Sequence, residues 1–332
     1  MNSDNSYQHR LEQAEPLTPE QRIQIEKDVK FTYRQAVGEI IYAMVTCRPD
    51  ISYAIIKLSQ YSTRPAAIHY EALQQLYRYL KATRTDGIYY WREEPREDLP
   101  KGNIPILKSD KNYDEMSVQE RIVHAKNILQ GYVDSDHASD ASHRRSVTGF
   151  HVKLAGGSVL YKTKFQDIVA QSSTEAEFIA AAEAGRYILY LRTIMSQIGM
   201  PQHHATILYE DNQGALLMAN AGQPTKRSKH IDIKHFAIQS WVEQDLLHFK
   251  RIATTDNSAD TMTKATARTL FYRHTNHIMG KIIPHYVKFT TQTKNHMEPR
   301  DKKDHHQIKC LALNVFVRNQ NPQFRTGGDV IR

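Results

Sequence analysis

Apolar side chains in the first third of the chain recur every three or four residues. This spacing covers three short segments, 33–45, 51–61 and 70–80, and places their apolar residues on one face of a helix. Pro49 and Pro65 lie between the segments, where proline interrupts helical hydrogen bonding. The pattern predicts three short helices joined by brief turns, which form a small helical subdomain.

The sequence on either side of this subdomain has a different character. Residues 1–28 are polar and predict a frayed lead-in. The run Gly-Ile-Tyr-Tyr-Trp at 87–91 is typical of a strand. Residues 94–129 are rich in charge and their first part is broken by prolines, which predicts a linker or surface insertion.

From Gln130 onward the apolar pattern changes to a period of two, as in strands. The predicted order is strands at 130–135, 147–155 and 158–163, a helix at 172–198, a strand at 206–210, helices at about 212–220 and 230–244, a strand at 246–252 and a helix at about 257–265. Ser172 and Glu175 have the spacing of a capping box at the start of the long helix. Strands that alternate with helices predict an α/β domain over 130–268, with a mixed sheet flanked by helices.

Composition and charge narrow the classes of protein. The 332 residues suggest about two domains, and 40% hydrophobic residues suffice for a core. We expect neither a membrane span nor a secretory signal, because long apolar runs are absent from the sequence and its N-terminus is polar. Two distant cysteines, Cys47 and Cys310, fit a reducing compartment and exclude a multi-cysteine zinc site.

The net charge of +8 is concentrated at the C-terminus. From Lys281 onward ten basic residues face four acidic ones, whereas 130–268 holds fifteen against fourteen. We therefore treat 269–332 as a basic C-terminal extension, poorly ordered beyond 290. A basic excess of this kind hints at nucleic acid, although its location matters more than its total.

Four acidic residues lie near the ends of the predicted elements. Asp134 is on the first strand, Glu177 is in the first turns of the long helix, Asp211 follows the strand at 206–210, and Asp260 is in the opening turn of the last helix. Two carboxylates about 4 Å apart repel by roughly 4 kcal/mol at an effective dielectric of 20. Two Mg²⁺ ions would neutralise such a cluster and bind phosphate oxygens.

Each acid also has a purely structural interpretation. Glu177 would favour a helix N-terminus through the dipole, Asp211 would serve as an N-cap, and so would Asp260 or one of its neighbours. Asp136 shares a strand face with Asp134 and is either a bystander or an acid that supports it. The order of the four acids along the βββ-α-β-α-α-β-α pattern favours the metal site.

Six motifs carry a resemblance to a known family: GYVDSD, RRSVTGF, AQSSTEAEFIAAAEA, YEDNQGALLMAN, KRSKHIDIKHF and TTDNSADTMTKA. In this order they resemble the ribonuclease H domain of copia-type (Pseudoviridae) LTR-retrotransposon Pol polyproteins. The helical stretch that begins YRQAVGEIIYAMVTCRPDISYA resembles the C-terminal end of the reverse transcriptase before it. The resemblance covers about 30–93 and 130–290 and implies a ribonuclease H-like fold.

The resemblance implies cleavage of the RNA strand of RNA–DNA hybrids with two divalent ions, Mg²⁺ or alternatively Mn²⁺. It assigns the metal-binding and catalytic carboxylates to Asp134, Glu177, Asp211 and Asp260. It also implies the rest of the Pol polyprotein, reverse transcriptase and integrase, as partners, with no membrane. The implied location is intracellular, in cytoplasmic virus-like particles, with the nucleus as a second site. Polymerase activity is not expected from this chain alone, because the polymerase aspartates are absent.

Basic and amide side chains near the acids are candidates for binding the hybrid, which requires mainly phosphate contacts. These candidates are Arg144, Arg145, Ser146, Asn212, Gln213, Lys226, Arg227, Lys229 and His230. The plainer interpretation of each basic group is a solvated surface. Zinc is not expected at His230 and His235, whose spacing of five suits one helix face poorly.

The chain departs from the family pattern in ways that leave alternatives open. His137 stands where tryptophan is common, and there is no histidine between His248 and Asp260 to serve as the mobile histidine of cellular ribonucleases H. The main alternative is a catalytically inactive retroelement remnant that binds nucleic acid or only folds. Strand transfer of the integrase type is a third possibility, which the STEAE and DNQ motifs disfavour.

Overall fold

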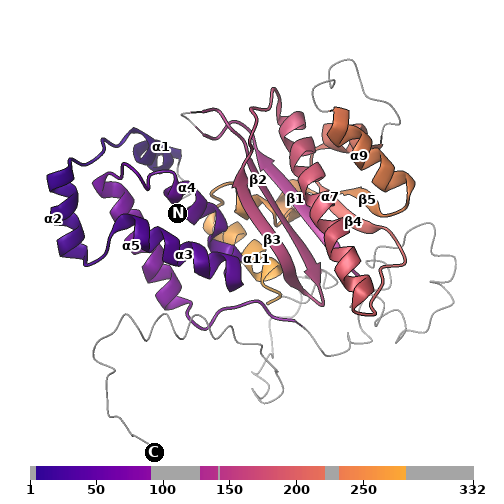
Figure 1. Ribbon diagram of the computed structural model, residues 1–332, viewed down its shortest axis with the longest axis horizontal. Coiled ribbons are helices and arrows are strands. Elements are labelled where there is room, and N and C mark those ends of the chain that lie inside the picture. The colour runs from indigo at the N-terminus through magenta and orange to yellow at the C-terminus, as the bar shows by residue number, and fades with distance from the viewer. Residues whose placement is uncertain (1–4, 91–127, 141–142, 221–231, 282–332) are drawn as a thin grey trace, which may run out of the picture.

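The computed structural model describes residues 5–90, 128–140, 143–220 and 232–281 (Figure 1). A group of helices from the N-terminal part lies beside a sheet with its own flanking helices. Within these ranges no helix is both long enough and apolar enough to cross a bilayer.

The N-terminal helices form one compact unit around a shared core. They are α1 (Asn5–Gln13), α2 (Pro19–Val29), α3 (Tyr33–Cys47), the 3₁₀ turn η1 (Pro49–Ile51), α4 (Ser52–Ser59) and α5 (Ala67–Ala82). The three predicted helices correspond to α3, α4 and α5. Leu73 from α5 and Ile55 from α4 are buried in the core of this unit.

The expected frayed lead-in is wrong, because two helices occupy most of it. Leu11 of α1 is fully buried in the core of the helical unit. α2 begins with a capping box in which the Thr18 hydroxyl accepts from Gln21 N at 3.3 Å and the Gln21 side chain accepts from Thr18 N at 3.0 Å. Pro19 in the first turn fits this start. Local capping and a few apolar contacts, with Leu11 the most deeply buried, therefore fix a stretch that is polar on average.

The second part is built on a five-stranded sheet in the order β3-β2-β1-β4-β5. Its strands are β1 (Gln130–Asp136), β2 (Val147–Leu154), β3 (Gly157–Phe165), β4 (Thr206–Glu210) and β5 (Leu247–Arg251). β2 pairs antiparallel with both β1 and β3, whereas β4 pairs parallel with both β1 and β5. The predicted mixed sheet flanked by helices, with a small helical subdomain before it, is confirmed.

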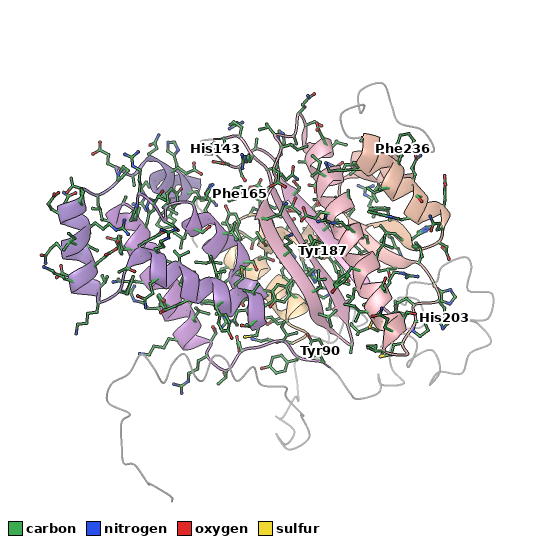
Figure 2. All side chains as sticks on the ribbon, in the orientation of Figure 1. Tyr90, His143, Phe165, Tyr187, His203 and Phe236 are labelled. Carbon is green, nitrogen blue, oxygen red and sulfur yellow. The ribbon has the colours of Figure 1, made fainter. Side chains whose placement is uncertain are left out.

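The long helix α7 (Ser173–Gln197) covers one face of the sheet, with α8 (Gln213–Asn220) and α9 (Asp232–Glu243) beside it (Figure 1). Five alanines from 176 to 184 are buried on α7, and these small side chains let the helix lie close to the strands. Tyr187, labelled in Figure 2, projects from α7 over the sheet, and its ring centroid is 5.5 Å from that of Phe150.

The short helix α10 (Asp260–Thr263) and α11 (Arg268–Ile278) pack on the other face. The helix expected at about 257–265 is thus shorter than predicted. All of α11 except Arg268 falls in the predicted C-terminal extension, 269–332, yet its His277 and Ile278 are buried against the sheet. The predicted disorder beyond residue 290 falls outside the described residues, as does most of the linker at 94–129.

The helical unit contacts the sheet domain directly. Tyr161 on β3 donates from its hydroxyl to Val45 O at 3.1 Å, and Lys57 Nζ on α4 lies 3.3 Å from Ser139 O in the loop after β1.

The predicted strand at 87–91 is wrong for its described part, 87–90, which is irregular. Tyr89 makes one backbone bond there, from its N–H to Met279 O at 2.8 Å.

Candidate active site

Asp134 is the central acid of the candidate site. It lies near the C-terminal end of β1, the middle strand of the sheet, opposite Gly149 of β2. Its side chain is buried. Because side chains alternate along a strand, Val133 enters the core under α7 while Asp134 faces α10 on the other side.

Glu177 reaches Asp134 because the start of α7 is fixed against β2. Ser172 caps the helix, with its hydroxyl accepting from Glu175 N at 3.1 Å. The Glu175 carboxylate accepts from Gln171 N at 2.9 Å, so the reciprocal bond of the predicted capping box shifts by one residue. The Gln166 amide nitrogen donates to Thr148 Oγ1 at 3.0 Å and to Ala176 O at 2.8 Å.

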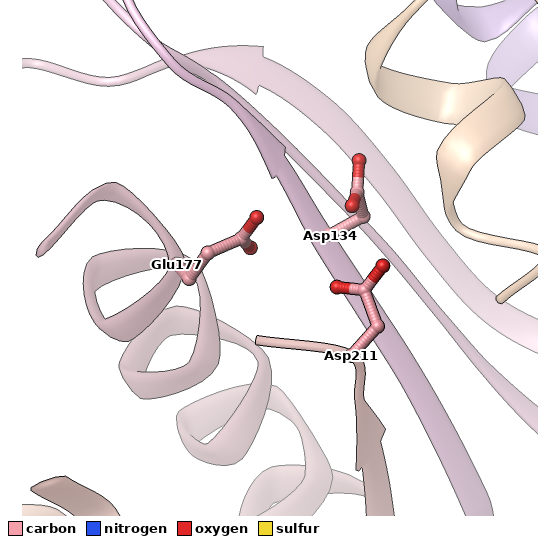
Figure 3. Close-up of side chains that lie close together, drawn as sticks. All are labelled: Asp134, Glu177 and Asp211. Carbon is pink, nitrogen blue, oxygen red and sulfur yellow. The ribbon is translucent and has the colours of Figure 1, made fainter. Parts of the chain in front are cut away.

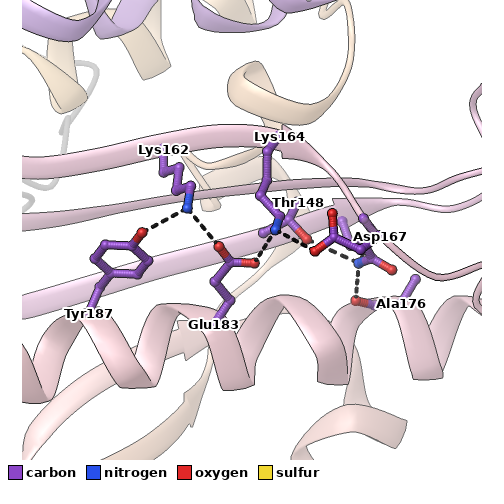
Figure 4. A network of polar contacts seen from close by, with 9 residues as sticks. Thr148, Lys162, Lys164, Asp167, Ala176, Glu183 and Tyr187 are labelled. Carbon is purple, nitrogen blue, oxygen red and sulfur yellow. Dashed lines mark hydrogen bonds and ion pairs between the residues drawn. The ribbon is translucent and has the colours of Figure 1, made fainter.

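A second set of polar contacts holds the same helix to the outer strand. Lys162 on β3 lies 2.9 Å from the Glu183 carboxylate of α7 and 2.8 Å from the Tyr187 hydroxyl (Figure 4). Lys164 lies 3.4 Å from the other oxygen of Glu183 and 3.1 Å from Asp167. The two pairs with Glu183 fix the distance between α7 and β3 and therefore the position of Glu177.

Asp211 follows β4 directly and is only partly buried. The next residue caps α8, since Asn212 Oδ1 accepts from Ala215 N at 3.0 Å. The alternative that Asp211 is an N-cap is therefore wrong. The same holds for Asp260, because the N-cap of α10 is Ala259. Both carboxylates are free of capping roles.

Carboxylate oxygens of Asp134, Glu177 and Asp211 all lie within 4.8 Å of one another (Figure 3). They come from β1, α7 and the end of β4, and they converge on one point. Oε2 of Glu177 is buried without a hydrogen-bond partner among the described residues. Two oxygens bound to one Mg²⁺ lie at most about 4.2 Å apart, so this trio fits a divalent cation after a small closing movement.

Asp260 joins the cluster through Asp134. Thr263, from the same short helix, donates its hydroxyl to Asp134 Oδ2. Lys264 Nζ lies 3.1 Å from Asp260 Oδ1 and 3.7 Å from Asp134 Oδ2. Gly149 allows α10 to approach this closely, because a Cβ there would be 2.6 Å from the Thr263 methyl and 2.9 Å from Met262 Cβ. All four predicted acids thus meet at this end of the sheet.

Burial raises the pKa of these carboxyl groups. The pKa of Asp134 rises to about 6, chiefly through burial, with Lys264 opposing the rise and Asp260 adding to it. Burial, reinforced by the charge of Asp134, raises the pKa of Glu177 well above its ordinary value. The pKa of Asp260 is also raised by burial. A cation would compensate for the cost of burying these charges, and its binding would release protons.

Two site residues were not predicted as such. Glu210 is fully buried beside Asp211, its Oε1 accepts from Asn212 N at 3.0 Å, and its charge raises the pKa of Glu177. Lys264 pairs with two of the four acids. The signals were present in the motifs YEDN and ADTMTK, but neither residue type suggests its role without the spatial arrangement.

The predicted nucleic-acid contacts divide into three groups. Arg144 and Arg145 are exposed in the loop after β1, and Gln213 is exposed at the start of α8. Ser146 is fully buried and its hydroxyl accepts from Ala138 N at 3.1 Å, so the prediction that it offers a donor to phosphate is wrong. Asn212 uses its carbonyl oxygen as a cap. The remaining predicted contacts lie outside the described residues: Lys226, Arg227, Lys229 and His230.

Sequence comparison places the chain beside transposon polyproteins. It is 32% identical over 242 residues to "Retrovirus-related Pol polyprotein from transposon TNT 1-94" of Nicotiana tabacum, which covers 73% of this chain and 16% of that protein. It is 30% identical over 273 residues to the corresponding polyprotein of transposon RE1 of Arabidopsis thaliana, covering 81% of this chain and 16% of that protein. The chain therefore corresponds to less than a fifth of these relatives.

A shorter relative and a solved structure complete the comparison. The chain is 35% identical over 159 residues to "Secreted RxLR effector protein 161" of Plasmopara viticola, covering 48% of this chain and 90% of that protein. The structure of LC11-RNase H1, isolated from compost, matches with a TM-score of 0.32 and 15% identity over 41% of this chain and 93% of that one. No family model matches the chain.

Proposed function

Because the chain belongs to the retrovirus-related Pol polyproteins of copia-type transposons, in the region of the reverse transcriptase end and the ribonuclease H domain, we propose that it cleaves the RNA strand of RNA–DNA hybrids. The observation that carries the proposal is the convergence of the Asp134, Glu177 and Asp211 oxygens within 4.8 Å. These three acids come from segments separated by more than thirty residues each, and their assembly has no evident structural purpose.

Two divalent cations, Mg²⁺ or Mn²⁺, would be held by the carboxylates of Asp134, Glu177, Asp211 and Asp260. Such ions supply a nucleophilic water of lowered pKa and stabilise the departing 3′ oxygen. The acids are rigidly placed: Asp134 by the middle strand, Glu177 by a capped helix and Asp260 by the contact of α10 with Gly149. This rigidity keeps the ligands in place before substrate arrives.

Exposed basic side chains in the loop after the Asp134 strand suit a phosphate backbone. Arg144 and Arg145 stand in the loop that leaves the Asp134 end of β1, where guanidinium groups can pair with phosphate oxygens. We keep Asn212 and Gln213 as further proposed contacts, together with the basic residues at 226–230, which lie outside the described residues. Phosphate contacts of this kind position a hybrid without reading its sequence.

The rest of the Pol polyprotein completes the proposed setting. The helical unit would be the end of the reverse transcriptase, and the parts that this chain does not contain would supply polymerase and integrase. We place the enzyme in cytoplasmic virus-like particles, with the nucleus as a second site. We propose the sequence-derived limits 29–93, 94–129 and 130–268 as the starting frame, with α1 and α2 added to the helical unit and α11 added to the sheet domain.

The test is cleavage of a labelled RNA–DNA hybrid by the purified 332-residue chain. With Mg²⁺ we expect cuts in the RNA strand only, and with EDTA none. Asp134→Asn should lower the rate by about 100-fold or more, the scale for losing a group that acts in the transition state. Asp167→Asn is the matched control, because Asp167 is an exposed aspartate paired with Lys164 away from the cluster. Folded wild-type protein without any metal-dependent product would instead identify an inactive remnant.

A further inference from the structure

A lysine lies among the carboxylates where a cation is expected. Lys264 follows α10 directly, and its backbone N–H donates to Asp260 O at 3.0 Å. Its Nζ lies 3.1 Å from Asp260 Oδ1 and 3.7 Å from Asp134 Oδ2. Lys264 therefore bridges the two acids that a second metal ion would have to share.

The charges around this lysine are unbalanced. The cluster contains four carboxylates, those of Asp134, Glu177, Asp211 and Asp260, and a fifth, that of Glu210, is buried behind them. Among the described residues, Lys264 makes the ion pairs with the two acids on the α10 side. One monovalent charge only partly offsets so many carboxylates, so the site as it stands still favours a further cation.

The lysine is held less firmly than its partners. Its side chain is 37% exposed, whereas those of Asp134 and Asp260 are 2% and 4% exposed. The Asp134 carboxylate also keeps the Thr263 hydroxyl as a donor. A lysine side chain has four rotatable bonds and a well-hydrated end group, so it can swing into solvent while the acids stay in place.

The geometry points to a role for Lys264 as a resident counter-cation: its ammonium holds Asp134 and Asp260 together in the metal-free protein, and a divalent ion must displace it to bind there. This inference rests on the proposed metal-dependent function of the same carboxylates. It makes two opposite predictions for the loss of the lysine. The metal-free protein becomes less stable, and the metal binds more tightly, because the ion no longer competes with the ammonium.

Calorimetric titration of the full chain with MnCl₂ tests this inference, with melting temperatures recorded in EDTA and in Mn²⁺. Lys264→Met should bind Mn²⁺ about tenfold more tightly or better. Its melting temperature should be lower than that of the wild type in EDTA and should rise more on adding Mn²⁺. Lys281→Met is the matched control, because it removes another partly exposed lysine that pairs with a carboxylate, Asp86, away from the cluster. We expect it to bind Mn²⁺ as the wild type does.

Lys264→Gln guards against failure of the methionine variant to fold, because its amide can still donate to Asp260. We expect Mn²⁺ binding tighter than in the wild type there too. Affinity for Mn²⁺ in Lys264→Gln and Lys264→Met that is equal to or weaker than that of the wild type overturns the inference. The proposed function fails separately: it is contradicted if Asp134→Asn binds Mn²⁺ as well as the wild type, whatever the lysine variants do.

Discussion

Lys153 offers a quantitative test of how the sheet domain is packed. It lies on β2 with its side chain buried under α11, and its Nζ donates to His277 O at 2.8 Å. Burial lowers its pKa from 10.5 to about 7. The Lys153 amine therefore binds its proton more weakly in the folded protein than in the unfolded chain.

The consequence for stability follows from proton linkage. Between about pH 7 and pH 10.5 the unfolded chain binds a proton that the folded protein does not, so the free energy of unfolding falls as the pH is lowered through this window. Below pH 7 Lys153 is protonated in both the folded and the unfolded state, so its effect on the free energy of unfolding no longer changes with pH. A shift of this size corresponds to roughly 4 kcal/mol between pH 10 and pH 6.

Lys153→Met should remove this dependence. The free energy of unfolding of the variant should exceed that of the wild type by more at pH 6 than at pH 10, with the difference changing by roughly 4 kcal/mol. His277 O keeps a donor in the variant, because Gly280 N lies 3.3 Å from it. The measurement is urea unfolding at four pH values in that range. Lys81→Met, an exposed lysine on α5, is the control. If the free energies of unfolding of the wild type and of Lys153→Met changed in parallel with pH, Lys153 would not have the lowered pKa.

Three further predictions concern the frame of the site and its protons. Phe178→Ala, on the buried face of α7, should cost about 3–5 kcal/mol in urea unfolding; a cost below 1 kcal/mol would contradict the packing. Ser172→Ala removes the α7 cap and should lower the free energy of unfolding by about 1 kcal/mol. Thermal unfolding would measure the loss, and an unchanged melting temperature would show that the cap is not needed. Because the pKa of Asp134 is raised to about 6, Mn²⁺ affinity should increase as pH rises from about 5 to 7 and then level off; calorimetry that finds no change over this range would contradict a buried ligand.

The sequence predicted most of the sheet domain, because its signals there are local. Strand alternation located β1 to β3, and the Ser172 cap located the start of α7. The four acids were found because each stands near the end of an element, and the ends of strands and helices in such a domain gather at one edge.

What the sequence did not reveal depends on tertiary contacts. Leu11 anchors α1 in a distant core, which hydrophobic periodicity within a polar segment cannot indicate. Ser146 is buried because Ala138 folds back on it, although its neighbours Arg144 and Arg145 are exposed. Lys264 was not singled out because its partners lie four and one hundred and thirty residues away in the chain.

The central claim is that these acids form a site for divalent cations. Crystals of the protein grown with Mn²⁺ would test it most directly, through the anomalous scattering of the metal. We predict two peaks at the end of β1, with an Asp134 oxygen between them and Lys264 turned away from Asp260. An anomalous map without a peak within coordination distance of Asp134, Glu177 and Asp211 would contradict the claim.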